Sequence, residues 1–553
     1  MADKGRKSSE RIPHYRLVLS QTLLTDDVVQ HTYSGSGTGS DPCIVDWIPD
    51  DARNPMNMAK GMKWTITVIM ALGTLSVTFS STAFSGALPQ IQEDLHTSLE
   101  LSVLSVSLFV LGFAIAPMTW APMSEHFGRQ RLYAITFGLL TIFGAASIGS
   151  KSIQTLLVLR FLAGTFGSSS IVNSAGVIAD MFVAKERGLA MMVFTSAPFL
   201  GPTIGPIAGG FVAQYGGWRW NDGMTVIFTG VLWILGMIFV PETYTPYLLV
   251  ERAKKLEQNT GKKYVSKLES GKEEVKASVT LSKAIARPWI ILFFEAIVLL
   301  LSIYSAIVYG ITYLIFTAFP IVFEQGRHWS QGVSGLSYVG VLVGQLLSMF
   351  FYVFLEVNYQ KKVATNPGKA KPEGRLQPAM IGAVLLPIGL FWFAWSTYPQ
   401  VHWIVSILGG AFFGFGQVLL YISLINYIVD AYTVYAASAL AANAILRGLF
   451  ATAFPLFTPY MYQNLGNQWA SSIPAFLALA CTPLPFVFHM YGDAIRARSK
   501  YAAKAQKITA AMLNETKVGG ESPSASSMAE EAAVKTLGNG VGPEALQNAS
   551  LVA

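Results

Sequence analysis

Two charged residues in one apolar stretch are the first candidates for chemistry in this chain. Arg160 lies about one helical turn into the stretch, and Asp180 ends it. A charge is costly in such surroundings, so Arg160 is by default a functional residue, and the alternative is that its side chain snorkels to a polar boundary. The two residues are twenty positions apart, which corresponds to about 30 Å of helix. The two side chains therefore cannot pair.

A second charged group stands between two apolar runs, in the segment Glu125-His126-Phe127-Gly128-Arg129-Gln130-Arg131. A tight loop needs the backbone freedom of Gly128. Carboxylate and guanidinium groups at helix ends can bond to helix termini and to each other, which would lock one packing of the helices. The alternative is a solvated basic loop.

Glycine and proline alternate in a third segment. Glycines every four residues form a smooth helix face that admits a close neighbour, and the prolines bend the helix. We expect a hinge helix, with a dimerisation face as the alternative. The hinge candidates are Pro198, Gly201, Pro202, Gly205, Pro206, Gly209 and Gly210.

The sequence shows no group of His, Asp and Glu with catalytic or metal-ligand spacing, and no phosphate-binding glycine loop. We therefore predict that the chain is not an enzyme and uses no cofactor or metal. A membrane enzyme or receptor is the remaining alternative of this kind. Cys43 and Cys481 cannot form a disulfide framework.

Composition indicates a membrane protein. The chain has 553 residues, of which 52% are hydrophobic and only 13% are charged, whereas soluble proteins carry about 25% charged residues. A membrane helix needs about 20 mostly apolar residues. Such runs lie near 65–88, 100–120, 131–150, 154–179, 188–213 and 223–241, and then near 296–320, 331–354, 376–396, 401–428, 435–461 and 468–490.

These runs predict an all-α polytopic membrane protein with two bundles of six helices. Residues 281–295 form either an interfacial helix or an early start of the seventh span. The predicted regions are a largely disordered N-terminal tail at 1–63, a first bundle at 64–241, a central loop at 242–287, a second bundle at 288–490 and a disordered tail at 491–553.

Lysine and arginine gather in alternate connectors, and such a bias marks the cytoplasmic side. The connectors with Arg129, Lys185 and Lys361 belong to the basic set, as do the central loop and the C-terminal tail. We therefore expect both termini in the cytoplasm. The net charge of +7 is explained by this bias, and no nucleic-acid partner is predicted.

The loop around Gly128 resembles a motif of the major facilitator superfamily, Gly-x-x-x-Asp-Arg-x-Gly-Arg-Arg, from which it departs at Ala121, Glu125 and His126. The glycine and proline segment resembles the antiporter motif of its drug:proton exchangers. Further blocks resemble the fungal twelve-span drug:proton antiporters, which export drugs, polyamines or secondary metabolites. They are Gly217-Trp-Arg-Trp220, Pro241-Glu-Thr-Tyr-Thr-Pro246, Tyr309-Gly-Ile-Thr-Tyr313, Asn426-Tyr-Ile-Val-Asp430 and Ala441-Ala-Asn443 with Arg447.

The resemblance implies roles for particular residues. It links Arg160 to proton movement and Asp180 to a latch with the loop, where Asp180 should lie beside Arg129 and Arg131. It also implies a substrate cavity lined by spans one, four, seven and ten, although packing or interface aromatics remain the alternative for each residue. The substrate candidates are Asn173, Tyr304, Tyr309, Tyr313, Gln417, Tyr421 and Asn426.

The predicted function is proton-coupled efflux of small lipophilic molecules by alternating access. Asp180, Glu125 and Arg160 are the candidates for proton coupling, because the spans hold almost no acidic residue near mid-membrane. Because a polycation would need buried carboxylates, we expect neutral or anionic substrates. A proton-coupled uptake symporter for a sugar or other nutrient is the alternative. We expect a monomer in the lipid of the plasma membrane, with the vacuolar membrane as alternative.

Overall fold

The computed structural model describes residues 12–20, 23–267, 277–365, 372–499 and 501–502. Almost all of its regular structure is helical, because a helix satisfies every backbone hydrogen bond within one apolar segment. The first half of the bundle contains α3 (Lys60–Thr82), α4 (Leu88–Asp94), α5 (Leu99–Ile115), α6 (Pro117–Phe127), α7 (Arg129–Ile148), α8 (Ile153–Gly167), α9 (Ser169–Met181) and α10 (Ala184–Phe239).

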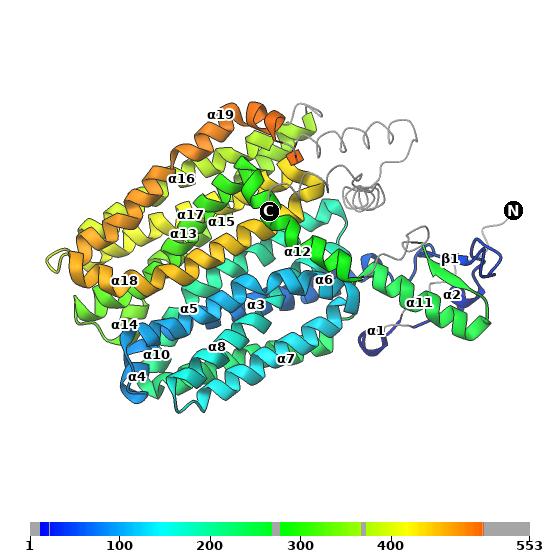
Figure 1. Cartoon of the computed structure of the whole chain (residues 1–553), viewed down its shortest axis with the longest axis horizontal. Coiled ribbons are helices and arrows are strands. Elements are labelled where there is room, and N and C mark those ends of the chain that lie inside the picture. Colours follow the sequence, from blue (N-terminus) through cyan, green and yellow to red (C-terminus); the bar gives the residue numbers. More distant parts are fainter. Residues whose placement is uncertain (1–11, 21–22, 268–276, 366–371, 500, 503–553) are drawn as a thin grey trace, which may run out of the picture.

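The second half follows a connecting region and is built in the same way. Its helices run side by side with those of the first half in one elongated bundle (Figure 1). They are α13 (Ala296–Pro320), α14 (Gln331–Gly335), α15 (Tyr338–Thr365), α16 (Gln377–Ser396), α17 (Trp403–Tyr432), α18 (Ala436–Cys481) and α19 (Pro483–Arg498).

Nine helices in the described residues are long and apolar enough to cross a membrane, and α5 with α6 form one further bent pair. Two of the nine are double. The helix α10 breaks at Gly217 (φ 83°, ψ 172°), and α18 breaks at Gly466 (φ 72°, ψ 166°). Glycine adopts such positive φ values without steric strain. Counting each double helix as two spans and the bent pair as one gives the twelve spans that the sequence predicts.

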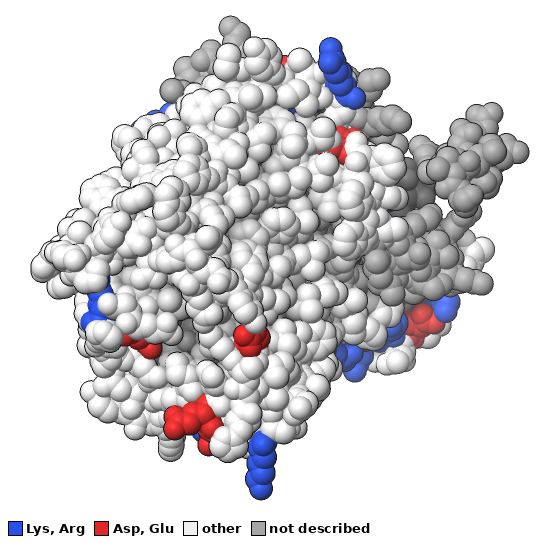
Figure 2. All heavy atoms as spheres, turned by 60° about the vertical axis from the view of Figure 1, so that its left-hand side comes forward, with Lys and Arg blue, Asp and Glu red and all other residues white. Residues whose placement is uncertain are grey.

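The surface agrees with this placement in lipid. Most of the face shown in Figure 2 carries neither basic nor acidic side chains. Large apolar side chains are exposed along the spans, among them Ile135, Phe350 and Phe354. An exposed apolar surface of this kind is stable when lipid covers it.

The halves meet along α5 with α18 and along α10 with α14 and α15. We call the end of the bundle that carries α6, α11 (Thr245–Thr260) and α12 (Ala277–Phe294) the loop end, and the end with α4 and α14 the far end (Figure 1). A separate helix α12 precedes α13, and its location in the membrane interface stays a prediction. Which end faces the cytoplasm stays a prediction.

The N-terminal segment differs from the largely disordered tail that the sequence predicts. Helices α1 (His14–Leu19) and α2 (Asp26–Gln30) and strand β1 (Cys43–Val45) lie at the loop end, and β1 pairs in parallel with β2 (Tyr264–Ser266) of the central loop. Val28 and Val45 share an apolar cluster with Leu249 and Leu256 of α11. Their apolar side chains explain the order, since the segment buries them against the loop.

Two buried arginines hold this segment to the central loop and the end of α10. Arg252 donates to both oxygens of Asp51, at 2.6 and 3.2 Å, and Arg53 donates to the backbone carbonyl of Glu242 at 3.2 Å. Burial lowers the pKa of Arg53 to about 10. At the other end of the chain, α19 extends to Arg498, beyond the predicted start of the tail at 491, and residues 503–553 lie outside the described residues.

Candidate functional site

At the loop end of the first half, a group of polar side chains joins four segments of the chain. We call Ser124, Arg129, Asp180, Glu242 and Thr243 the Arg129 cluster. The Nε atom of Arg129 donates to Asp180 at 3.4 Å, and its Nη1 atom donates to Ser124 Oγ. Thr243 Oγ1 donates to the same oxygen of Asp180 at 3.2 Å. The cluster therefore ties α6, α7 and α9 to the segment after α10, and the predicted proximity of Asp180 and Arg129 is confirmed.

Glu242 is the part of this cluster that sequence analysis missed. Its carboxylate accepts the backbone N–H groups of Arg129 and Gln130 at 3.0 and 3.1 Å, at the first turn of α7. It also accepts those of Thr243 and Tyr244. A negative charge is favoured at a helix N-terminus. In the sequence, Glu242 stands in the block after span six, which carries only a family resemblance, and the start of α7 offers no side-chain cap of its own.

Gly128 lets this contact form. Its φ is 90°, and a Cβ atom there would come within 2.3 Å of a Glu242 oxygen, so the predicted need for glycine has a physical basis. Arg131 forms no ion pair with Asp180 among the described residues. Its guanidinium lies 5.7 Å from the ring of Tyr247 in α11. Glu125 is exposed near the end of α6. The coupling and gating roles of these residues stay predictions.

Near the far end, Arg160 is buried, with 2% of its surface exposed. Its Nη2 atom donates to the backbone carbonyl of Ser80 at 2.9 Å, and its Nη1 atom lies 4.0 Å from Asp222 Oδ1. Its guanidinium also lies over the rings of Phe84 and Phe109, at 4.1 and 4.5 Å. The side chain therefore does not snorkel to a polar boundary, and that alternative is wrong.

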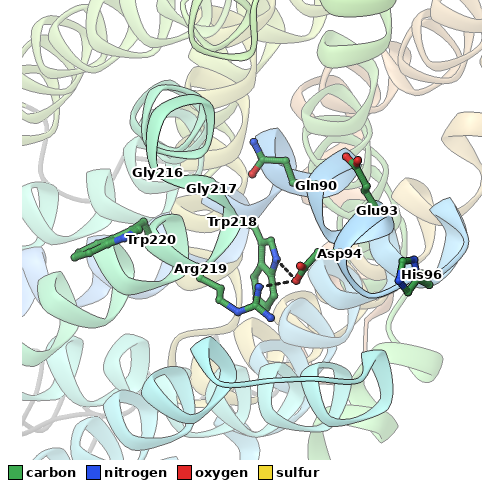
Figure 3. Close-up of a pocket in the computed structure, with 9 residues that line it drawn as sticks. All are labelled: Gln90, Glu93, Asp94, His96, Gly216, Gly217, Trp218, Arg219 and Trp220. Atoms are coloured by element: carbon green, nitrogen blue, oxygen red, sulfur yellow. Dashed lines mark hydrogen bonds and ion pairs between the residues drawn. The ribbon is translucent and has the colours of Figure 1, made fainter.

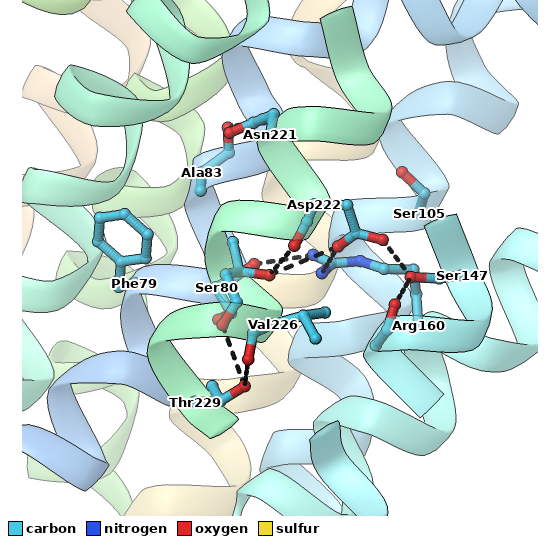
Figure 4. Close-up of polar contacts among 12 residues, drawn as sticks. Phe79, Ser80, Ala83, Ser105, Ser147, Arg160, Asn221, Asp222, Val226 and Thr229 are labelled. Atoms are coloured by element: carbon cyan, nitrogen blue, oxygen red, sulfur yellow. Dashed lines mark hydrogen bonds and ion pairs between the residues drawn. The ribbon is translucent and has the colours of Figure 1, made fainter. Parts of the chain in front are cut away.

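Asp222 belongs to α10, just after the break at Gly217, and Figure 4 shows it pointing toward Arg160. Its other oxygen accepts a hydrogen bond from Ser147 of α7. Asp222 is 1% exposed. Asp222 was not among the predicted coupling candidates, although it lies within a span, near its end. The omission arose because the predicted sixth span began at 223, which placed this carboxylate in a connector.

The glycine face of α10 packs against α3 of the same half. A Cβ atom at Gly201, Gly205 or Gly209 would come within 2.0 to 2.5 Å of Thr78, Thr82 or Ala83. Thr82 Oγ1 donates to the carbonyl of Pro202 at 2.8 Å, which has no partner in the helix because Pro206 lacks an N–H. Further along, Pro206 and Gly210 contact α14 of the second half.

Polar and aromatic side chains meet between the two halves. Tyr313 of α13 shares a hydrogen bond of 2.9 Å with Ser81 of α3. The ring of Tyr421 in α17 lies 4.7 Å from that of Phe199 in α10. The rings of Tyr309 and Tyr313 are 5.3 Å apart. Three of the predicted substrate residues therefore lie together near this interface.

The other predicted substrate residues lie in different surroundings. Gln417 is buried, and its Nε2 atom donates to Thr312 of α13 at 2.7 Å. Tyr304 is fully buried in the core of the second half. Asn426 donates to the hydroxyl of Tyr352.

Asn173 donates to the backbone carbonyl of Arg129 at 2.8 Å. It therefore lies with the Arg129 cluster and not with the aromatic group between the halves.

A hollow of about 690 Å³ opens at the far end beside the break in α10 (Figure 3). Its wall includes Asp94, which accepts hydrogen bonds from Trp218 and Arg219. These contacts hold α4 to the start of the sixth span. Among the described residues, no three side chains of His, Cys, Asp or Glu come together as a metal site.

Comparison with known proteins agrees with this architecture. The model of the Major Facilitator Superfamily matches residues 70–455. The chain is 52% identical over 505 residues to "MFS-type efflux pump MFS2" of Trichophyton rubrum, covering 91% of this chain and 85% of that protein. It is 50% identical to "Major facilitator superfamily multidrug transporter mdrA" of Aspergillus fumigatus, covering 92% and 84%.

A third relative, "Efflux pump FUB11" of Gibberella moniliformis, is 48% identical, with coverage of 88% of this chain and 82% of that protein. Among solved structures, the xylose transporter XylE from E. coli in a partially occluded inward open conformation matches with a TM-score of 0.56 and 19% identity. It covers 78% of this chain and 98% of XylE, and at that identity the likeness concerns the fold. The chain is an integral membrane protein that belongs to the major facilitator superfamily.

Proposed function

We propose that this chain exports small lipophilic organic molecules in exchange for protons, by alternating access between its two halves. Three relatives with 48% to 52% sequence identity to this chain are named as efflux pumps or as a multidrug transporter. The two-bundle architecture supports the alternating-access part of the proposal. The plasma membrane is the proposed location, and the transporter acts as a monomer within its lipid.

The observation that carries the mechanism is the contact between halves at the far end. Gln90 of α4 donates to Gln331 of α14 at 3.0 Å, and Gln214 of α10 accepts the backbone N–H of Gly332 at 2.8 Å. A Cβ atom at Gly210 would come within 2.7 Å of the Gln331 carbonyl. Gly210 therefore permits a close contact between α10 and α14 that must separate when the far end opens.

Coupling to protons needs a group whose charge changes the packing near this contact. Asp222 is buried, faces Arg160 and accepts a hydrogen bond from Ser147. It connects α10 with α7 and α8, and Arg160 connects α8 with Ser80 of α3. Neutralising Asp222 would weaken the attraction within this group, and the helices that close the far end would change their relative stability.

The test uses the purified full-length chain in liposomes that contain a hydrophobic fluorescent dye. Imposing a pH gradient should drive dye transport by the unchanged chain, and Asp222→Asn should remove the dependence on the gradient. Asp94→Asn is the matched control, since that carboxylate pairs with Arg219 on the exposed far end and should keep the dependence. Gradient-driven transport that survives Asp222→Asn at the original rate would exclude this coupling.

The direction of transport distinguishes export from uptake. Expression in cells should lower their content of the dye, whereas a nutrient symporter would not. A raised dye content would contradict export.

A further inference from the structure

One buried charge remains unexplained by the fold and the proposed coupling. Arg447 of α18 is 7% exposed, and it lies eleven residues after the start of the helix at Ala436. That separation corresponds to about 16 Å of helix, close to half of the hydrocarbon thickness. An arginine keeps its positive charge in proteins.

Arg447 differs from the other buried arginines of the described residues. Each of the others donates a hydrogen bond to a carboxylate or a backbone carbonyl. Among the described residues, Arg447 has no carboxylate within 4.0 Å, and its Nη1 atom is buried without any hydrogen-bond partner. A buried cation without a counter-ion is unfavourable. Its presence at this depth therefore requires a reason other than stability.

Two tyrosine rings surround the charge. The guanidinium carbon lies 4.6 Å from the ring centre of Tyr309 and 4.7 Å from that of Tyr421. Aromatic faces attract a cation but accept no ordinary hydrogen bond from it. The N–H groups point outward in the plane of a guanidinium, so they remain able to bind an anion.

The location suits a transported anion. Tyr421 contacts Phe199 of the first half, and Gly448, the residue after Arg447, lies so close to Ala114 of α5 that a Cβ atom would come within 2.1 Å of it. Arg447 therefore sits where the two halves meet and where alternating access changes the packing.

Neighbouring polar atoms are also available. Tyr309 Oη and Gln417 Oε1 are buried without hydrogen-bond partners among the described residues. Gln417 lies one turn before Tyr421 on α17. A hydroxyl donor and an amide acceptor close to a cation can orient the polar group of a small molecule.

We propose that Arg447 binds the anionic group of the exported molecule, and that the preferred cargo is an organic acid with an aromatic or aliphatic body. The inference rests on the proposed export function and names its substrate class. A carboxylate would accept two N–H groups of Arg447 in the plane of the guanidinium, and the rings of Tyr309 and Tyr421 would contact the apolar body. The cargo then supplies the counter-ion that none of the described residues provides.

The test measures binding of matched compounds to the purified full-length chain in detergent. The probes are radiolabelled 4-butylbenzoate, 4-butylbenzamide and 4-butylbenzylamine, which have similar shapes but are an anion, a neutral molecule and a cation. The corresponding acid, amide and amine of naphthalene form a second set. The acids should bind about 10- to 100-fold more tightly than the amides, as expected for hydrogen bonds to a charged group. The amines should bind most weakly, since Arg447 repels them.

Variants of Arg447 test whether its side chain causes the preference for acids over amides. Arg447→Gln should reduce acid affinity to that of the amide and leave amide affinity unchanged, which also shows that the site is still folded. Arg447→Lys keeps a charge but loses the planar fork, and should retain part of the preference. If Arg447→Gln does not fold, the comparison of acid with amide in the unchanged chain carries the test.

Several outcomes would overturn the proposal. They are equal affinity for acids and amides, acid binding that survives Arg447→Gln, and a chain that binds none of the acids. The export function fails by a different observation, namely a dye content that does not fall on expression. A chain that lowers the dye content but prefers neutral compounds would refute the inference alone.

Discussion

The two halves of this transporter surround a buried arginine with different side chains. In the first half, Arg160 lies beside Asp222 and donates to the Ser80 carbonyl. In the second half, Arg447 contacts the rings of Tyr309 and Tyr421 but pairs with no carboxylate among the described residues. Both charges are buried in the bundle, so burial alone does not indicate their roles. The difference is whether a carboxylate of the described residues acts as the counter-ion.

Physical magnitudes make the contrast informative. Moving an ion out of water costs several kcal/mol even after the protein relaxes, and a close carboxylate offsets much of that cost. A cation on an aromatic ring gains about 0.5 to 2 kcal/mol, so two rings compensate only part of it. A buried arginine that is paired with a carboxylate thus contributes to the folded structure. A buried arginine without such a pair can bind an anionic ligand.

The largest expected effect comes from breaking the pair in the first half. Asp222→Ala leaves Arg160 buried without its counter-ion, and it should lower the free energy of unfolding by about 3 to 5 kcal/mol. The measurement is unfolding of the purified protein in mixed detergent micelles. Arg160→Leu with Asp222→Leu is the control, because removing both charges should recover most of the loss. Equal stability of Asp222→Ala and the unchanged chain would show that Arg160 needs no counter-ion.

A second prediction concerns another paired charge of the first half. Glu242→Gln removes the charge of a carboxylate that accepts two backbone N–H groups at the start of α7 and two in the segment after α10. Hydrogen bonds to a charged group contribute about 1.5 to 3 kcal/mol, and we expect a loss of about 2 kcal/mol. The same unfolding measurement applies, with Glu93→Gln at the far end as an exposed control. A larger loss in the control would reject the capping role.

The unpaired charge should behave in the opposite direction. Arg447→Met removes a buried cation without leaving a carboxylate unpaired, so it should raise the free energy of unfolding by about 1 to 2 kcal/mol. It should also remove the preference for acids. A loss of stability comparable to that of Asp222→Ala would mean that Arg447 has a structural partner, and the contrast between the halves would disappear.

The smallest effect tests the aromatic contacts. Tyr421→Leu keeps an apolar side chain but removes one ring from Arg447, and a cation on a ring contributes about 1 kcal/mol. Acid affinity should fall about fivefold, which corresponds to that energy. Tyr462→Leu, whose ring is buried elsewhere in α18, is the control and should leave acid affinity unchanged. An unchanged affinity in Tyr421→Leu would remove that ring from the site.

Local sequence was enough for the spans and their number. An apolar run of about 20 residues must satisfy its own backbone in lipid, so it becomes a helix whatever its neighbours are. Gly217 and Gly466 then mark breaks that depend on the backbone freedom of a single residue. Distance along one helix also excluded a pair between Arg160 and Asp180, since the rise per residue is constant.

The partners of the charges were decided only by the tertiary structure. Asp222 was missed because a shift of one residue in a span boundary placed it outside the membrane, and Glu242 because its four donors lie in two different segments. Whether a buried arginine has a counter-ion depends on which helices pack together, and residues far apart in sequence carry no local signal of that packing. Sequence therefore determined that Arg160 and Arg447 lie in apolar helices. Only the packed bundle decided that Arg160 has a carboxylate partner among the described residues and that Arg447 does not.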